Sequence, residues 1–166
     1  MKVKFGGDEV TLVGNQVKVG DTAPEFKAVK RDLSDFDSKE TEGKIVIYSV
    51  APSIDTSVCS LQAQTFNEKA AELSDDIVIY TITVDLPFAQ ERFCAAKGID
   101  KADIISDYRY KEFGEKYGFL IDELQLLARG VVIVDKDGKV AYTEYVEEVT
   151  NEVNFDKALE AAKELA

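Results

Sequence analysis

One of the two cysteines in the chain follows a run of residues that favours reactivity. Residues 51 to 59 are A-P-S-I-D-T-S-V-C, so Cys59 comes shortly after a proline, an aspartate and a threonine. Proline fixes the backbone entering a turn, and Asp, Ser and Thr are favoured just before a helix. We therefore expect a helix that begins near Thr56 or Ser57 and carries Cys59 in its first turn.

A cysteine in the first turn of a helix is well placed to ionise. The free backbone N–H groups and the positive end of the helix dipole stabilise an anion there, and the thiolate is the nucleophilic form of cysteine. The inert alternative is a cysteine packed in the core. It rests on the apolar stripe that this helix would have, which comprises Cys59, Ala63, Phe66, Ala70 and Leu73. The turn and cap residues before Cys59 favour the reactive interpretation.

The sequence has no histidine, which narrows the chemistry. Catalysis by Ser-His-Asp or Cys-His groups is excluded, and so are zinc sites with imidazole ligands. Neither GxGxxG nor GxxxxGK[ST] occurs, so no nucleotide-binding loop is indicated. We expect neither a cofactor nor a metal.

Length, charge and hydropathy describe the protein as a whole. The 166 residues contain no Gly/Ser/Pro-rich linker, so we predict a single domain over residues 1–166. The net charge of −12 opposes binding to nucleic acid or anionic membranes. No apolar run approaches the roughly 20 residues of a membrane span, and the N-terminal residues do not resemble a signal peptide. We expect a cytoplasmic protein, in which two cysteines are seldom a permanent disulfide.

The hydrophobic pattern predicts the elements that position the cysteines. Residues 45–50 and 77–84 are continuous β-branched runs, typical of strands buried on both faces, with a helix between them. Two hairpins are expected, over residues 2–13 and 130–146, and a short strand near Val29. Further helices are expected over residues 107–117, ended by Gly118, and after an Asn154 cap. This order predicts a three-layer α/β fold with a mixed central sheet flanked by helices.

The second cysteine belongs to another expected helix. Its apolar stripe comprises Leu86, Ala89, Phe93 and Ala96. Cys94 lies about 100° to one side of that stripe, so we expect it to be partly reachable. The pattern alone leaves open that Cys94 only fills space at the boundary of the hydrophobic core and has no chemical role.

Four segments together match a known pattern. P-S-I-D-T-S-V-C fits P-x-x-x-T-x-x-C, with Pro52, Thr56 and Cys59 at the specified places. The other segments are V-G-D-T-A-P-E-F (19–26), D-L-P-F-A-Q-E-R-F-C (85–94) and A-R-G-V-V-I-V-D (128–135). On these residues the chain resembles the thiol peroxidase branch of the peroxiredoxins, the atypical two-cysteine members. Ser57 stands at a position that varies among relatives.

The resemblance implies a thioredoxin-like fold and a role for each matched residue. Cys59 would attack a hydroperoxide as a thiolate and become a sulfenic acid. Thr56 would hydrogen-bond the sulfur and the peroxide, and Pro52 would screen the sulfenic acid from solvent. Arg129 would supply a permanent cation, which makes a histidine base unnecessary. From pattern alone, Arg129 could instead be an ordinary charge at the edge of a strand.

The resemblance also implies how the cycle closes. Cys94 would be the resolving cysteine, forming a disulfide with Cys59 that thioredoxin reduces. Because a disulfide needs Cα atoms within roughly 7 Å, we expect local opening around both cysteines first. The implied substrates are organic and lipid hydroperoxides ahead of hydrogen peroxide, and the implied assembly is a homodimer. The alternatives are a redox sensor or binding module on the same fold and, less favoured, a structural disulfide protein.

Overall fold

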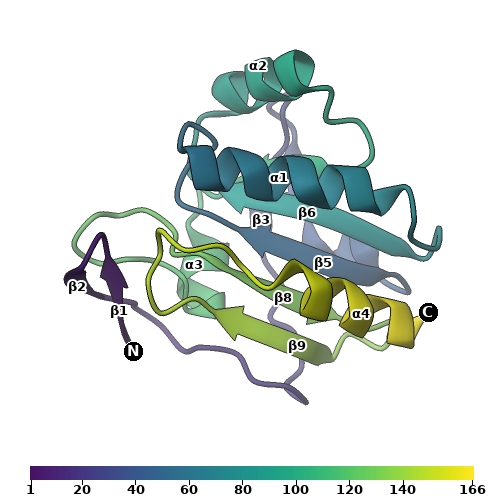
Figure 1. The fold of residues 1–166 in the computed structure, drawn as a ribbon. Helices are drawn as coiled ribbons and strands as arrows, with labels where there is room; N and C mark the ends of the chain where they lie inside the picture. The colour runs from purple at the N-terminus through teal and green to yellow at the C-terminus, as the bar shows by residue number, and fades with distance from the viewer.

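The computed structural model describes residues 1–166 and consists of a mixed β-sheet with helices on both faces (Figure 1). The strands are β1 (Lys2–Phe5), β2 (Asp8–Thr11), β3 (Lys27–Val29), β4 (Asp35–Asp37), β5 (Ile45–Val50), β6 (Ile77–Thr83), β7 (Asp103–Ser106), β8 (Gly130–Val134) and β9 (Val140–Tyr145). The helices are the 3-10 helix η1 (Ser38–Thr41) and the α-helices α1 (Ser57–Ala70), α2 (Pro87–Lys97), α3 (Glu112–Tyr117) and α4 (Phe155–Leu165). None of the α-helices combines the length and the apolar character that a membrane crossing needs.

Seven strands form the main sheet, in the order β4-β3-β7-β6-β5-β8-β9. Strands β5, β6 and β7 are parallel, because α1 and α2 carry the chain back to the same edge each time. The hairpin β8–β9 adds to β5 in antiparallel fashion, and β3 and β4 complete the opposite side. Strands β1 and β2 form the separate N-terminal hairpin. The predicted mixed sheet and hairpin are confirmed.

Strand β5 is buried along its whole length and serves both faces of the sheet. Ile45 and Ile47 belong to the cluster that packs against α1 and α4, whereas Tyr48 and Val50 belong to the cluster that includes α3. This alternation follows from the two-residue period of a strand. The continuous apolar run therefore has the predicted cause, and β5 is a rigid support for the residues after it.

The helix predicted over residues 107–117 is shorter than expected. Helix α3 begins at Glu112, because Lys111 has a left-handed backbone (φ 55°) that a helix cannot continue through. The carboxylate of Asp107 accepts the N–H groups of Phe113 and Gly114 at 3.1 and 2.8 Å and so caps this helix. The predicted end at Gly118 is confirmed. Strands β4 and β7 were not predicted, since runs of three and four residues give little periodic signal.

Candidate active site

Cys59 lies where β5 delivers the chain to the start of α1. Thr56 is the N-cap of this helix, and its hydroxyl oxygen accepts the backbone N–H of Cys59 at 3.2 Å. Cys59 is the third residue of the helix, and only 1% of it is exposed. The predicted helix start is confirmed, and Pro52 is buried in the preceding turn. The expected bond from Thr56 to the sulfur is not formed, because the hydroxyl is directed to the backbone of Cys59 and of Ser53.

Arg129 is buried beside the sulfur of Cys59. It directly precedes β8, which pairs with β5, and it is only 2% exposed. Its Nη2 donates to Cys59 Sγ at 3.0 Å, its Nη1 to Gln62 Oε1 at 2.8 Å and its Nε to the carbonyl of Val149 at 2.6 Å. The guanidinium is therefore fixed on three sides, with one donor aimed at the sulfur.

The charge of Arg129 has no carboxylate partner. None of the ion pairs in the structure involves this residue. An uncompensated buried charge costs several kcal/mol, so buried cations are nearly always paired with an anion. The acceptors around Arg129 are an amide oxygen, a carbonyl oxygen and the sulfur of Cys59. Of these three acceptors, only the sulfur can become an anion, so the guanidinium contacts the one group that could balance its charge.

Gln62 orients Arg129, and sequence reasoning missed it. It is 1% exposed, accepts from Arg129 and donates through Nε2 to Ser49 Oγ at 2.8 Å and the carbonyl of Val50 at 3.1 Å. A glutamine inside an apolar pattern is usually assigned to the surface. Its spacing was the available signal, because residues three apart on a helix share a face and Gln62 is three beyond Cys59.

Asp85 holds the loop that precedes Cys59 and was also missed. Its carboxylate accepts the Ser53 hydroxyl at 2.7 Å, the Ile54 N–H at 2.9 Å and the Thr83 hydroxyl at 2.6 Å. Asp85 follows β6 and precedes α2, so it connects the loop before Cys59 to the segment that leads to Cys94. The only sequence signal was its place at the start of the matched segment 85–94.

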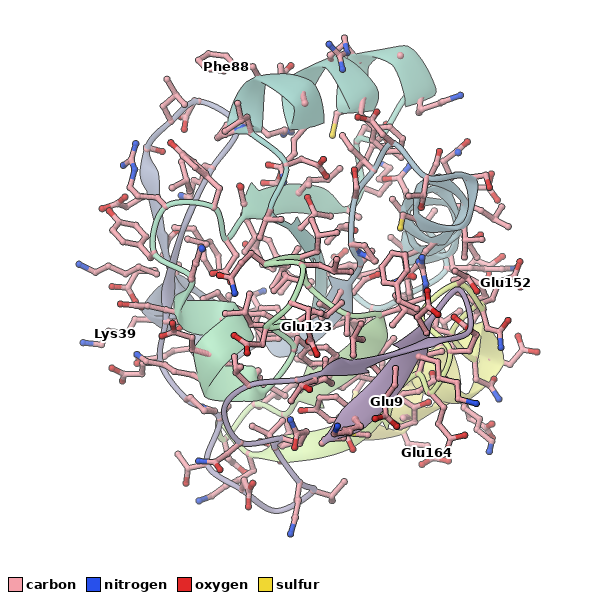
Figure 2. All side chains as sticks on the ribbon, turned by 90° about the vertical axis from the view of Figure 1, so that its left-hand side faces the viewer. Glu9, Lys39, Phe88, Glu123, Glu152 and Glu164 are labelled. Carbon is pink, nitrogen blue, oxygen red and sulfur yellow. The ribbon has the colours of Figure 1, made fainter.

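Cys94 is buried, and the prediction that it is partly reachable is wrong. It is 3% exposed, whereas Leu86, assigned to the inward stripe, is 54% exposed. The inward side of α2 contains Pro87, Gln90, Phe93 and Cys94. Gln90 is accommodated there because its amide donates to Thr83 Oγ1 and the carbonyl of Ile105, both at 3.1 Å. Phe88, 68% exposed, points away from the body of the protein (Figure 2).

The buried position of Cys94 changes its acidity. Burial raises the pKa of the Cys94 thiol to about 11, against the opposing effect of the Arg31 guanidinium. The carboxylates of Asp103 and Glu91 raise this pKa further. Cys94 is therefore a protonated thiol at neutral pH, and neither cysteine forms a disulfide in this state.

A cavity of about 440 Å³ lies toward the start of β5, lined among others by Lys44, Val46 and Tyr48, and contains none of the predicted site residues. No group of three or more His, Cys, Asp and Glu side chains is placed to hold a metal ion. The two cysteines and Arg129 are therefore the groups to consider.

The chain is similar to known proteins in sequence and in fold. The profile of the family described as Redoxin matches residues 18–159. The thiol peroxidase of Bacillus subtilis (strain 168) is 52% identical over 164 residues, covering 99% of this chain and 98% of that protein. A peroxiredoxin-like protein from Aquifex aeolicus superimposes with a TM-score of 0.94 at 40% identity, over 99% of this chain and 97% of its own. The thiol peroxidase from Chromobacterium violaceum, 20% identical, shares the fold with a TM-score of 0.87, over 99% of this chain and 96% of its own.

Proposed function

The chain belongs to the redoxin family, as a thiol-dependent peroxidase of the peroxiredoxin type, and we propose that Cys59 is its peroxide-attacking residue. The observation that carries this proposal is the contact of 3.0 Å between Arg129 Nη2 and Cys59 Sγ, made by a buried guanidinium without a carboxylate partner. Such a cation lowers the free energy of the thiolate relative to the thiol. We propose that the whole of residues 1–166 acts as one domain around this site.

In the first step the Cys59 thiolate attacks one oxygen of the hydroperoxide. The S–O bond forms as the O–O bond breaks, and the leaving oxygen takes up a proton to give an alcohol or water. Cys59 becomes a sulfenic acid. Arg129 stabilises the thiolate and the negative charge that develops on the leaving oxygen. Thr56 fixes the first turn of α1 and offers its hydroxyl to the peroxide, while Pro52 limits access of water.

In the second step Cys94 forms a disulfide with Cys59. The two sulfurs are buried and belong to different helices. In the docked position, where α2 packs against the sheet, Cys94 is a protonated thiol with a pKa raised to about 11. Cys94 must therefore leave its docked position to ionise and to reach Cys59. We propose that the first turn of α1 unwinds and that the segment around Cys94 shifts, a local opening that costs less than global unfolding.

The remaining proposals concern the substrates, the reductant, the location and the assembly of the enzyme. We propose that it reduces organic and lipid hydroperoxides as well as hydrogen peroxide, in antioxidant defence. A disulfide between two mobile segments is open to an external dithiol, and we assign that role to thioredoxin. A cytoplasmic location and a homodimer are proposed from the resemblance to thiol peroxidases.

The test is consumption of cumene hydroperoxide coupled to thioredoxin. Cys59→Ser should abolish turnover, because no thiolate attacks the peroxide. Cys94→Ser should consume one equivalent and then stop, since the sulfenic acid has no intramolecular partner. Continued turnover in Cys59→Ser would refute the assignment of the attacking residue, and normal cycling in Cys94→Ser would refute that of the resolving residue.

A further inference from the structure

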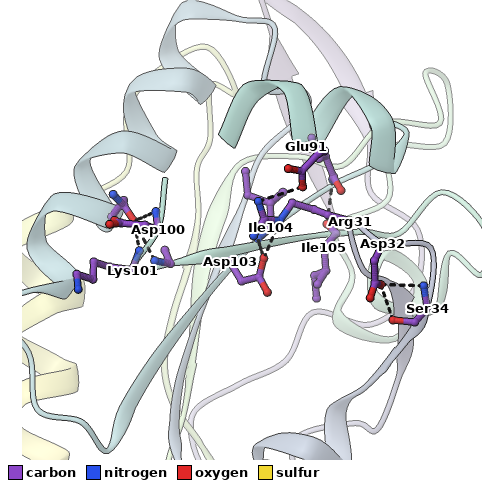
Figure 3. Close-up of polar contacts among 12 residues, drawn as sticks. Arg31, Asp32, Ser34, Glu91, Asp100, Lys101, Asp103, Ile104 and Ile105 are labelled. Carbon is purple, nitrogen blue, oxygen red and sulfur yellow. Dashed lines mark hydrogen bonds and ion pairs between the residues drawn. The ribbon is translucent and has the colours of Figure 1, made fainter. Parts of the chain in front are cut away.

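Arg31 connects the helix that carries Cys94 to the sheet. It lies in the turn between β3 and β4, where the N–H of Leu33 donates to the carbonyl of Lys30 at 2.9 Å. Its Nη1 lies 3.3 Å from Glu91 Oε2 on α2, and its Nε donates to Asp103 Oδ1, at the start of β7, at 3.2 Å. Figure 3 shows the guanidinium between these two carboxylates. One side chain thus bridges α2, β7 and the turn that follows β3.

The charge of the same guanidinium also reaches the sulfur of Cys94. Glu91 is three residues before Cys94, so the two side chains lie on one side of α2. The positive charge of Arg31 lowers the pKa of the Cys94 thiol, although burial raises that pKa overall. The charged groups around Cys94 therefore come from three elements, namely Glu91 on its own helix, Asp103 on β7 and Arg31 on the turn after β3.

These contacts bear on the resolving step, and the inference rests on the function proposed above. The Cys94 thiol loses its proton, and the resulting thiolate attacks the sulfur of the Cys59 sulfenic acid. The S–S bond forms, the S–O bond breaks, and the departing hydroxide takes up a proton to become water. Cys59 is reduced and Cys94 is oxidised. Docked Cys94 cannot start this reaction, because it is buried and protonated.

We propose that Arg31 holds the helix of Cys94 in its docked position and thereby limits the rate of disulfide formation. Two effects of removing Arg31 have to be weighed. Loss of its charge would raise the pKa of docked Cys94 further, but that thiol is already protonated at neutral pH, so little changes. Loss of its two ion pairs makes release of α2 easier, and release is the step that exposes and ionises the sulfur. The net effect is faster resolution.

The size of the effect follows from the exposure of the ion pairs. The side chains of Arg31, Glu91 and Asp103 are 28%, 59% and 45% exposed. Partly exposed pairs contribute modestly, and apolar packing of Phe93 and Cys94 also keeps the helix docked. We therefore expect Arg31→Gln to form the disulfide about threefold faster.

The experiment separates the two chemical steps. Reduced protein receives one equivalent of hydrogen peroxide, peroxide loss reports attack by Cys59, and alkylation quenching with intact-mass analysis reports the disulfide. Arg31→Gln and Glu91→Gln should both accelerate the disulfide and leave the attack unchanged. Lys30→Gln is the matched control, because Lys30 lies in the same turn but pairs with Glu40, away from α2. Added salt should accelerate the wild type and have little effect on Arg31→Gln.

Excess peroxide provides a second readout. A sulfenic acid that waits for Cys94 can react with another peroxide, which transfers one oxygen and leaves a sulfinic acid. Arg31→Gln should therefore accumulate about threefold less sulfinic acid per turnover than the wild type.

Three outcomes would overturn the inference. Slower disulfide formation in Arg31→Gln with faster formation in Glu91→Gln would make the guanidinium an activator of the Cys94 sulfur and not a restraint. Equal rates in Arg31→Gln, Glu91→Gln and Lys30→Gln would leave Arg31 without a role in resolution. A wild type that consumes peroxide but forms no disulfide would refute the proposed second step, and this inference with it.

Discussion

Replacing Arg129 tests the electrostatic basis of the site. In Arg129→Met the sulfur of Cys59 loses the donor at 3.0 Å and the only cation in contact with it. Arg129→Lys keeps a positive charge, but one ammonium cannot reproduce the guanidinium's three bonds to Cys59, Gln62 and Val149. We expect both variants to attack peroxide more slowly, and the methionine variant to be the slower of the two.

The magnitude follows from the bond that is lost. A hydrogen bond to a charged group contributes about 1.5–3 kcal/mol, and about 1.4 kcal/mol corresponds to a factor of ten in an equilibrium. Loss of the Arg129 contact should therefore reduce the second-order rate constant for peroxide by about 10- to 100-fold at neutral pH. Because the carbonyl of Val149 and the amide of Gln62 lose their donor, the free energy of unfolding should fall as well.

The assay is stopped-flow consumption of peroxide by reduced protein, with urea unfolding to verify that each variant is folded. Arg109→Met is the matched control, because Arg109 is exposed and its side chain contacts Asp35 and Tyr108 but neither cysteine. It should attack peroxide at the wild-type rate. A folded Arg129→Met that reacts as fast as Arg109→Met would show that the guanidinium does not assist the attack of Cys59.

Three further predictions concern polar side chains that stabilise the fold. Thr56→Val should cost about 1 kcal/mol of stability through loss of the N-cap, measured by urea unfolding, whereas Thr56→Ser should cost much less; equal losses would argue against the cap. The Asn67 amide oxygen accepts the backbone N–H groups of residues 100–102 at 2.7–3.1 Å. Asn67→Ala should therefore lower the free energy of unfolding by about 3 kcal/mol and speed amide hydrogen exchange at these three residues. Unchanged exchange there would contradict this. Burial raises the pKa of Asp107 to about 7, so folding favours the protonated form of this side chain. The protonated side chain contributes its full stabilisation below about pH 4, and this contribution is lost as the pH rises to 7. Asn cannot titrate, so raising the pH from about 4 to 7 should lower the free energy of unfolding of the wild type by about 4 kcal/mol relative to that of Asp107→Asn. A difference between the two proteins that does not change with pH would contradict the raised pKa of Asp107.

Much of the frame could be predicted because its elements are long or strongly punctuated. The continuous apolar runs of β5 and β6 are typical of strands in the centre of a sheet. The Asn154 cap indicates the start of α4, and the turn before Val140 indicates the start of β9. The position of Cys59 followed from Pro52 and Thr56 in the same way. Such signals are local, so a single sequence displays them.

The inward face of α2 could not be predicted because it depends on tertiary hydrogen bonds. Gln90 looks like a surface residue in the sequence, yet its side-chain NH2 donates to Thr83 and to the carbonyl of Ile105, which keeps this face of α2, with Cys94, directed inward. The support of Arg129 by Gln62 is hidden for the same reason. A hydrophobic pattern assigns polar residues to solvent unless their partners are known, and those partners lie on other elements.

The ionisation of Cys59 in the reduced protein at neutral pH decides whether Arg129 activates this sulfur. Ultraviolet thiolate absorbance can be compared between the wild type and Cys59→Ser, and Cys94 adds nothing because its raised pKa of about 11 keeps it protonated. We expect one thiolate in the wild type, none in Cys59→Ser, and a reduced signal in Arg129→Met. Equal absorbance in the wild type and Cys59→Ser would show that Cys59 is a protonated thiol and that Arg129 does not activate it.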